Sequence, residues 1–581
     1  MTKLSPDEVP RFTREFFGGG ECFSRIGEGE LGGKARGLVF IKNTIESEIA
    51  AGRFPGVTVD IPTTTVIATG VFDAFVERNG LAALATSDTP DDRIALAFQA
   101  GEMPVEVVGD LRALVEQVHT PLAVRSSSLL EDAMFRPFAG VYQTKMIPNN
   151  QPDPNVRFRR LLEAIKFVYA SVYSRRARSY LRTCDRSIAD EKMAVIIQEV
   201  VGERHDRRFY PDLSGVGRSY NFYPTGGATP DEGVVNLALG LGKTIVDGGV
   251  TWSYSPAHPG APPPFGSASD LLRNTQSEFW AVNMGDAPEY DPVAETEYLV
   301  KSDLHAAEMD DTLRWTASTY DGQRDRVVMG TGVDGPRVLT FAPLLEMHDL
   351  PFQDVVSALL DASGRAFGAA VEFEFAALLP RERGAPLRIA FLQVRPMVVS
   401  EAEVSIEDDE LASPALLLAS DRVMGNGADD TIRDVVFVRP ERFEARDTRA
   451  IAGELERLNL RLLDEGRRYL LIGFGRWGSS DPWLGIPVAW GDICGAGAIV
   501  EATLPSMNVE LSQGSHFFHN ITSFQVSYLA VRHDRQPNID WDWLRAQTLV
   551  EETEHVCHVR SASPLRIKVD GRSGRGAIWH A

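Results

Sequence analysis

The residues best suited to phosphate chemistry lie between Pro121 and Thr144. A short apolar stretch, Leu122–Val124, leads into Arg125 and three serines, and Phe138-Ala139-Gly140 then forms a compact turn. A guanidinium makes planar bidentate hydrogen bonds with phosphate, and small residues let backbone N–H groups approach closely. The same residues are equally compatible with an ordinary strand, loop and serine turn. The rest of the chain has to separate these two interpretations.

A second candidate is Lys34, which follows a glycine-rich segment, Ile26–Gly37, at the start of an expected helix. The N-terminus of a helix offers free N–H groups and the positive end of its dipole, both of which favour a phosphate. No GKS or GKT follows the glycines, so the segment is not a Walker A motif. The alternative is a solvated loop lysine.

Carboxylate, amide and guanidinium groups alternate along two expected strands near residues 371–396. Glu372 and Glu374 share one face of the first strand, and Gln393 and Arg395 share one face of the second. Two antiparallel strands presenting these groups together would suit Mg²⁺ bound to a polyphosphate, because carboxylate oxygens hold the ion and arginine neutralises the phosphate. The alternative is an exposed polar face on a two-stranded ribbon.

Several elements would position these side chains. The apolar run Met193–Gly202 predicts a strand buried in a central sheet, and Phe352–Phe367 predicts a helix. Val57–Ala68 alternates like one strand, and Arg157–Arg182 predicts an amphipathic helix with a charged outer face. Residues 250–330 show no regular pattern.

Length and charge limit the class of protein. A chain of 581 residues exceeds one core and predicts two to four domains. Lys and Arg total 59 against 81 Asp and Glu, a net charge of −22, which argues against nucleic-acid and anionic-membrane partners. No apolar run reaches the roughly 18 residues that a spanning helix needs, and the first residues lack a signal-peptide core. Four widely spaced cysteines indicate reduced thiols in a cytoplasmic protein and no zinc site.

In their order along the chain, several motifs resemble one known domain: GGKARGL, AVRSSSLLED with FAGVYQT, the IQEVVG strand, LGLGK, and EFEFA with LQVRP. They resemble the N-terminal ATP-binding domain of phosphoenolpyruvate synthase, pyruvate phosphate dikinase and rifampin phosphotransferase, an ATP-grasp fold, over about residues 15–400. The resemblance implies an α+β protein with three parts. These are an ATP-grasp domain at 1–400, a linker with a small αβ element at 401–455, and a smaller α/β domain at 456–581.

The resemblance also implies roles for single residues. The expected ATP phosphate ligands are Lys34, Arg125 and Thr144, and Arg395 would grip the phosphate being transferred. The expected adenine-binding strand contains Gln198, Glu199 and Val201, acting largely through the backbone. The expected Mg²⁺ ligands are Glu374 and Gln393. Relatives commonly carry Glu at the position of Lys243, which leaves its role open, and the loop before Gln393 is longer than usual.

Downstream of residue 400 the resemblance to phosphoenolpyruvate synthase weakens. The remaining residues are too few for both a phosphohistidine domain and a pyruvate-binding barrel, since a barrel alone needs roughly 250 residues. The stretch Ser512–Asn520 contains Gly-Ser-His, so His516 is the candidate phosphate carrier of a diverged phosphohistidine-like domain. The alternative is a histidine satisfied by hydrogen bonds at a helix start. This region also resembles uncharacterised phosphoenolpyruvate-synthase-like proteins, which supplies no activity.

The resulting hypothesis is an Mg²⁺-dependent enzyme that binds ATP and passes a phosphoryl group to an unidentified acceptor, with Arg125, Arg395 and His516 as its catalytic residues. The product would be AMP and phosphate for dikinase-like transfer, or ADP without a carrier histidine. Two alternatives stay open: an ATP-binding regulatory or sensor protein, and an ATP-grasp ligase. The oligomeric state stays open.

Overall fold

The structure is a computed structural model of the 581-residue chain. It describes residues 8–16, 21–49, 52–87, 89–129, 131, 141–183, 188, 191–222, 224, 228–261, 268–273, 275–382, 384–399, 404–479, 481–507, 521, 524–535, 538–571 and 573–580. Helices and mixed sheets alternate irregularly along these residues, which confirms the expected α+β class.

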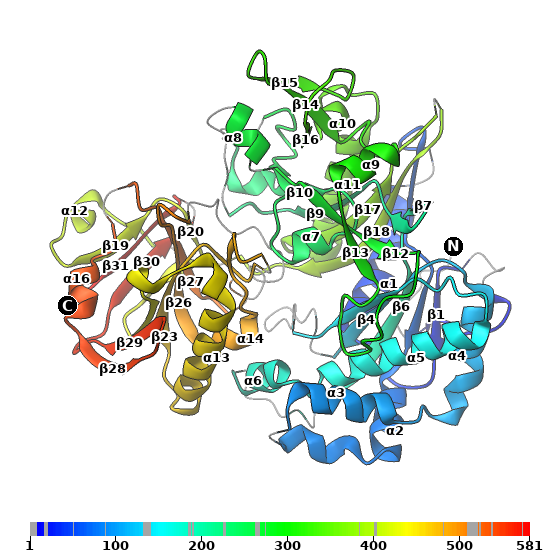
Figure 1. The fold of residues 1–581 in the computed structure, drawn as a ribbon, viewed down its shortest axis with the longest axis horizontal. Helices are drawn as coiled ribbons and strands as arrows, with labels where there is room; N and C mark the ends of the chain where they lie inside the picture. Colours follow the sequence, from blue (N-terminus) through cyan, green and yellow to red (C-terminus); the bar gives the residue numbers. More distant parts are fainter. Residues whose placement is uncertain are drawn as a thin grey trace.

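The first sheet has five strands, in the order β1 (Phe23–Ile26), β3 (Thr64–Ile67), β6 (Met193–Glu199), β4 (Leu122–Ser128) and β5 (Thr144–Ile147). β6 lies at its centre, as the uninterrupted apolar run predicted, and most of its side chains are buried. The helices that accompany this sheet in the lower right of Figure 1 are α2 (Thr69–Arg78), α3 (Asp91–Ala100), α4 (Val105–Gln117) and α5 (Pro154–Ser171). The next helix, α6 (Arg175–Thr183), contacts α14 (Trp490–Ile493) of the C-terminal part.

The second sheet has six strands, in the order β11 (Trp252–Tyr254), β10 (Val234–Ala238), β9 (Leu213–Arg218), β17 (Val371–Leu378), β18 (Leu387–Pro396) and β2 (Val57–Asp60). The helix α11 (Phe352–Phe367) forms with the predicted bounds and packs on β17, while α1 (Gly33–Glu48) packs on β18 and also contacts β4 of the first sheet.

Residues 57–68 form two strands, where the sequence predicted one. β2 pairs with β18 in the second sheet, and β3 pairs with β1 and β6 in the first. Residues 61–63 are the only link between them, and Pro62 stands in this link. Proline has no N–H for a strand ladder, which accounts for the break in pairing.

Residues 250–330 also differ from expectation, because they contain regular elements. One sheet has the order β13 (Leu299–Asp303), β12 (Glu278–Asn283), β8 (Arg208–Tyr210) and β7 (Glu203–His205). Another has the order β15 (Arg326–Met329), β14 (Ala317–Asp321) and β16 (Arg337–Leu339). The helices of this part and of the segments on either side of it are α7 (Lys243–Val246), α8 (Ala268–Arg273), α9 (Leu304–Met309) and α10 (Ala342–Glu346).

The C-terminal part, coloured yellow to red in Figure 1, lies beside both earlier sheets. Its larger sheet has the order β20 (Val423–Met424), β27 (Ser527–Val531), β26 (Ala496–Ala502), β23 (Tyr469–Phe474), β22 (Asp434–Val438), β29 (Val556–Arg560) and β28 (Thr548–Glu552). Its smaller sheets are β19 (Leu416–Ser420), β31 (Arg575–Trp579), β30 (Arg566–Asp570) and β21 (Asn426–Asp429), and the pair β24 (Arg476–Trp477) and β25 (Gly485–Ile486). Its helices are α12 (Asp408–Leu411), α13 (Thr448–Asp464), α14 (Trp490–Ile493) and α16 (Trp541–Arg545).

Strand pairing places the start of the C-terminal part earlier than expected. Strands β19 to β22, within residues 416–438, pair with strands from beyond residue 460. The division expected at residue 456 therefore does not coincide with the boundary of these sheets. We call residues 404–580 the C-terminal domain.

Candidate active site

A cavity of about 380 Å³ lies where the first two sheets meet the C-terminal domain. Its size is typical of a pocket for a small organic ligand. The first sheet and its flank contribute Ala123, Arg125, Tyr142, Gln143, Thr144, Met146, Gln198, Glu199, Val200 and Val201. The second sheet contributes Ser214, Gly215, Val216, Glu374, Phe375, Ala376 and Leu392. Polar groups thus converge on a lining that is otherwise apolar.

Arg125 lines this cavity and joins the two sheets. Its guanidinium donates to Glu374 Oε2 at 3.1 Å and to Gln393 Oε1 at 2.6 Å. It also donates to Gln198 Oε1 at 3.4 Å and to the Leu392 carbonyl at 3.3 Å. Acceptors from both sheets hold this guanidinium at the cavity, where it could bind an anionic ligand.

The polar residues of β17 and β18 form two directly opposed pairs. Glu374 faces Gln393 across the ladder, and Glu372 faces Arg395. The strands lie inside the six-stranded sheet, and Glu372, Gln393 and Arg395 are at most 2% exposed. The alternative of an exposed polar ribbon is therefore wrong.

Glu372 is shared by two arginines. Its Oε2 accepts from Arg218 Nε at 2.6 Å, and its Oε1 accepts from Arg395. Burial alone would raise the pKa of this carboxyl, but the two guanidinium groups outweigh it and the pKa is lowered. Arg395 is held behind the cavity by this network and is absent from the lining. Arg218 was missed at the sequence level, because a lone arginine after Ser214-Gly-Val-Gly carries no pattern.

Lys34 is buried, which contradicts the alternative of a solvated loop lysine. Its ammonium donates to Glu131 Oε1 at 2.7 Å and to Ser126 Oγ at 3.2 Å. The glycine-rich segment allows this approach: Gly32 has φ +75°, and a Cβ there would lie 1.7 Å from the Ser127 carbonyl oxygen. Lys34 thus contacts β4 at the residue after Arg125 but does not line the cavity.

The expected adenine-binding strand forms one wall of the cavity. Gln198 accepts from Arg125 and donates from Nε2 to Thr64 Oγ1 at 3.1 Å. Burial raises the pKa of the Glu199 carboxyl, and Arg388 partly opposes the shift. Thr144 lies opposite Arg125 in the β4–β5 ladder. Val201 is buried beside them.

The structure also places Lys243 in the lining, together with two acidic neighbours. Its Nζ lies 3.1 Å from Asp247 Oδ2 and 3.7 Å from Glu295 Oε1. Burial lowers the pKa of Lys243, but the two carboxylates outweigh this and the net shift is upward. Burial raises the pKa of Glu295, against the effect of Lys243. Glu295 was missed because its surroundings showed no sequence pattern.

Two further expectations concern His516 and metal binding. His516 lies outside the described residues, as does the turn Phe138-Ala139-Gly140. Among the described residues, no group of three His, Cys, Asp or Glu side chains could hold a metal ion. No helix in the described part of the chain is long and apolar enough to cross a membrane.

Comparison with known proteins shows that most of the chain matches one protein family. Residues 28–413 match the model of the family described as pyruvate phosphate dikinase, AMP/ATP-binding domain. One relative is an uncharacterized phosphotransferase, YvkC, of Bacillus subtilis, 28% identical over 193 residues. That match covers 33% of this chain and 20% of the relative. Another is a phosphoenolpyruvate synthase of Aeropyrum pernix, 30% identical over 147 residues, covering 25% of this chain and 16% of the relative. The chain thus matches only a fifth or less of either relative.

Proposed function

Because the chain belongs to the pyruvate phosphate dikinase AMP/ATP-binding domain family, we propose that it is an Mg²⁺-dependent phosphotransferase that cleaves ATP in the cavity around Arg125. The observation that carries the proposal is that Arg125 and Glu374, from two sheets, line one cavity, while Gln393 accepts a hydrogen bond from the same Arg125 guanidinium. Cleaving ATP needs little covalent chemistry from the protein, so positioning and charge neutralisation are the contributions to look for.

In this proposal the nucleotide base lies against the strand that contains Gln198, Glu199 and Val201. Apolar side chains from Met146 and Leu392 line the same cavity and would cover a flat ring system. The triphosphate then extends toward Arg125, whose guanidinium would neutralise it, and Thr144 stands opposite on the neighbouring strand.

Glu374 and Gln393 fit an Mg²⁺ ion by chemistry, since a carboxylate and an amide oxygen are hard donors that face one another across the ladder. Both oxygens accept from Arg125, so holding the ion would require the guanidinium to turn toward phosphate oxygens. Two protein ligands are the usual number for Mg²⁺ that is otherwise held by water and nucleotide phosphates. When bound, the ion would supply charge neutralisation at the phosphates.

Lys34 and Arg395 enter the proposal as phosphate ligands through the family resemblance. Each is engaged by a buried carboxylate, Glu131 and Glu372 respectively. Either cation would reach a phosphate by directing further N–H donors to it or by exchanging that partner. His516 is the proposed carrier if the phosphoryl group passes through the protein, in which case a P–O bond of ATP breaks and a P–N bond to imidazole forms.

The test is to incubate the full chain with ATP and Mg²⁺ and to identify the nucleotide product. AMP supports dikinase-like transfer, and ADP supports a simple kinase or a ligase. ATP binding without any product would refute the enzyme and favour the sensor alternative.

Two arginine variants test the site itself. Arg125→Met should weaken ATP binding about 10- to 100-fold, because a hydrogen bond to a charged group is worth about 1.5–3 kcal/mol. Arg93→Met is the matched control, since Arg93 is exposed on α3. Equal ATP affinity in both variants would remove Arg125 from the proposed site. An acid-labile phosphoenzyme that persists in His516→Gln would exclude His516 as the carrier.

A further inference from the structure

The C-terminal domain supplies part of the wall of the cavity. Five of its residues line the same space as Arg125 and Glu199: Gly478, Pro487, Val488, Ala489 and Trp490. They lie beyond residue 413, where the match to the ATP-binding family ends. The family therefore does not account for this wall.

One contact fixes this segment to the loop that follows α7. Arg476, 6% exposed, donates from Nη1 to the carbonyl oxygens of Gly248 at 3.2 Å and Gly249 at 3.3 Å. The same loop follows directly from Lys243 and Asp247, which line the cavity. A buried guanidinium on backbone carbonyls is costly to separate, because its donors would lose their acceptors.

A second contact joins α14 to α6. Gly491 lies so close to α6 that a Cβ there would be 3.0 Å from the Arg176 carbonyl oxygen and 2.6 Å from its side chain. The Arg176 guanidinium, itself part of the cavity lining, lies 3.9 Å from Asp492. Burial raises the pKa of Asp492, with Arg176 acting against the shift. The arginines expected on a charged outer face thus meet the C-terminal domain.

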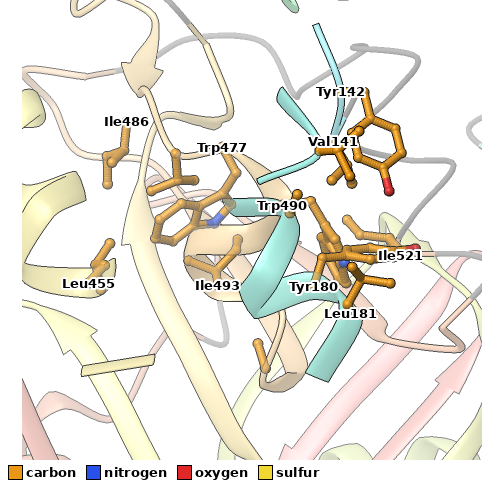
Figure 2. Close-up of a cluster of buried hydrophobic side chains, with 14 of the residues drawn as sticks. Val141, Tyr142, Tyr180, Leu181, Leu455, Trp477, Ile486, Trp490, Ile493 and Ile521 are labelled. Atoms are coloured by element: carbon orange, nitrogen blue, oxygen red, sulfur yellow. The ribbon is translucent and has the colours of Figure 1, made fainter. Parts of the chain in front are cut away.

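An apolar cluster completes the junction. Trp490 stacks on Phe524 with ring centroids 5.7 Å apart, and Tyr180 of α6 meets Phe524 edge-on at 5.4 Å. Figure 2 shows Trp490 and Ile521 of the C-terminal domain beside Tyr180 of the ATP-binding part. These side chains belong to one continuous buried cluster that spans both parts. Such a surface would be exposed if the two parts separated.

We infer that the docked C-terminal domain is a component of the nucleotide site. Docking of this domain on the ATP-binding part and binding of nucleotide are then cooperative. This inference rests on the proposed function. Nucleotide held in the cavity touches both parts and strengthens their docking, and by thermodynamic reciprocity docking strengthens nucleotide binding by the same factor. Pro487, Val488, Ala489 and Trp490 are then positioning residues for the nucleotide, although they lie outside the family domain.

Two substitutions in the C-terminal domain test this coupling. Gly491→Val forces α14 away from α6, because no space is available for the added side chain. Ala489→Phe adds bulk directly to the cavity wall. Each should raise the dissociation constant for ATP at least about tenfold, measured by calorimetry on the full chain.

The same domain offers a matched control for each substitution. Gly453→Val adds the same side chain to α13, where nothing lies within 4 Å. Ala546→Phe adds the same ring at an exposed position after α16. Both controls should bind ATP within about twofold of the wild type, and circular dichroism should show that all four variants fold.

The outcomes separate the inference from the proposed function. Wild type that fails to bind ATP refutes both. Wild type that binds ATP, with Gly491→Val and Ala489→Phe binding it equally well, refutes only the inference. As a reciprocal measurement, ATP should slow hydrogen exchange in α14 and α6 of the wild type. Unchanged exchange in these helices at saturating ATP would also overturn the coupling.

Discussion

Replacing Lys34 by methionine should destabilise the protein, because Lys34 is the cation that pairs with the buried Glu131 carboxylate among the residues that the structure describes. Glu131 is 1% exposed and lies 2.7 Å from the ammonium. It would keep its bonds from Ser126 Oγ and the Ser128 N–H, both 2.9 Å long. Removing one partner of a buried ion pair typically costs about 3–5 kcal/mol. We expect the lower half of this range, since two hydrogen bonds remain.

A double-mutant cycle provides the assay. Urea unfolding followed by circular dichroism would compare Lys34→Met, Glu131→Gln and the double variant. Removing both charges leaves neither partner uncompensated, so the double variant should lose less stability than the sum of the single losses, by at least about 1 kcal/mol. Additive losses would refute the reasoning. A loss below about 0.5 kcal/mol in Lys34→Met, as for a surface substitution, would refute it as well.

The same two single variants report on the proposed phosphate role. If Lys34 exchanges Glu131 for a phosphate, Lys34→Met should weaken ATP binding about 10- to 100-fold. Glu131→Gln releases the ammonium and should not weaken it. Equal affinities in the two variants would leave Lys34 as a structural residue only.

Substitutions of Glu372, Lys243 and Phe373 should each have a measurable effect. Glu372→Gln should lower the free energy of unfolding by about 3–5 kcal/mol at pH 7. The pKa of Glu372 is lowered in the folded state, so its contribution to stability is lost as pH falls below the ordinary value of 4.5. The free energies of unfolding of wild type and variant should therefore converge as the pH is lowered. A difference that stays constant with pH would contradict this. Lys243→Glu should place a third carboxylate beside Asp247 and Glu295. It should therefore raise the ATP dissociation constant more than Lys243→Met does. Equal dissociation constants for the two variants in calorimetry would exclude this charge effect. Phe373→Ala should cost about 3–5 kcal/mol in urea unfolding, since its fully buried ring stacks on Phe391 at 5.1 Å, and a loss below about 1 kcal/mol would contradict the packing.

Strong periodicity accounts for the parts of the fold that could be predicted. The helix Phe352–Phe367 and the strands around Glu374 and Gln393 formed as expected, because their apolar side chains recur at the spacing of each element. The strands between residues 278 and 329 were missed. They are short and partly exposed, so their side chains alternate too weakly to reveal them.

The residue types of the site could be predicted from the sequence, but which of their side chains line the cavity could not. Arg125, Glu374 and Gln393 meet as expected. Whether a polar side chain lines the cavity or lies behind it depends on packing between the sheets, which no local sequence pattern encodes. Arg395, for example, lies behind the cavity wall. The wall from Gly478 to Trp490 joins segments far apart in the chain and was likewise beyond sequence reasoning.

The switch of residues 57–67 from one sheet to the next has a mechanical consequence. Only residues 61–63 connect β2 of the second sheet to β3 of the first. Three residues span at most about 10 Å when fully extended, so the sheets are tethered at this point. The Glu199 N–H also donates to the Thr63 carbonyl at 3.1 Å, which ties the tether to the strand at the cavity. Where β2 leads into β3, the two sheets therefore cannot separate by more than about this length while both strands stay paired.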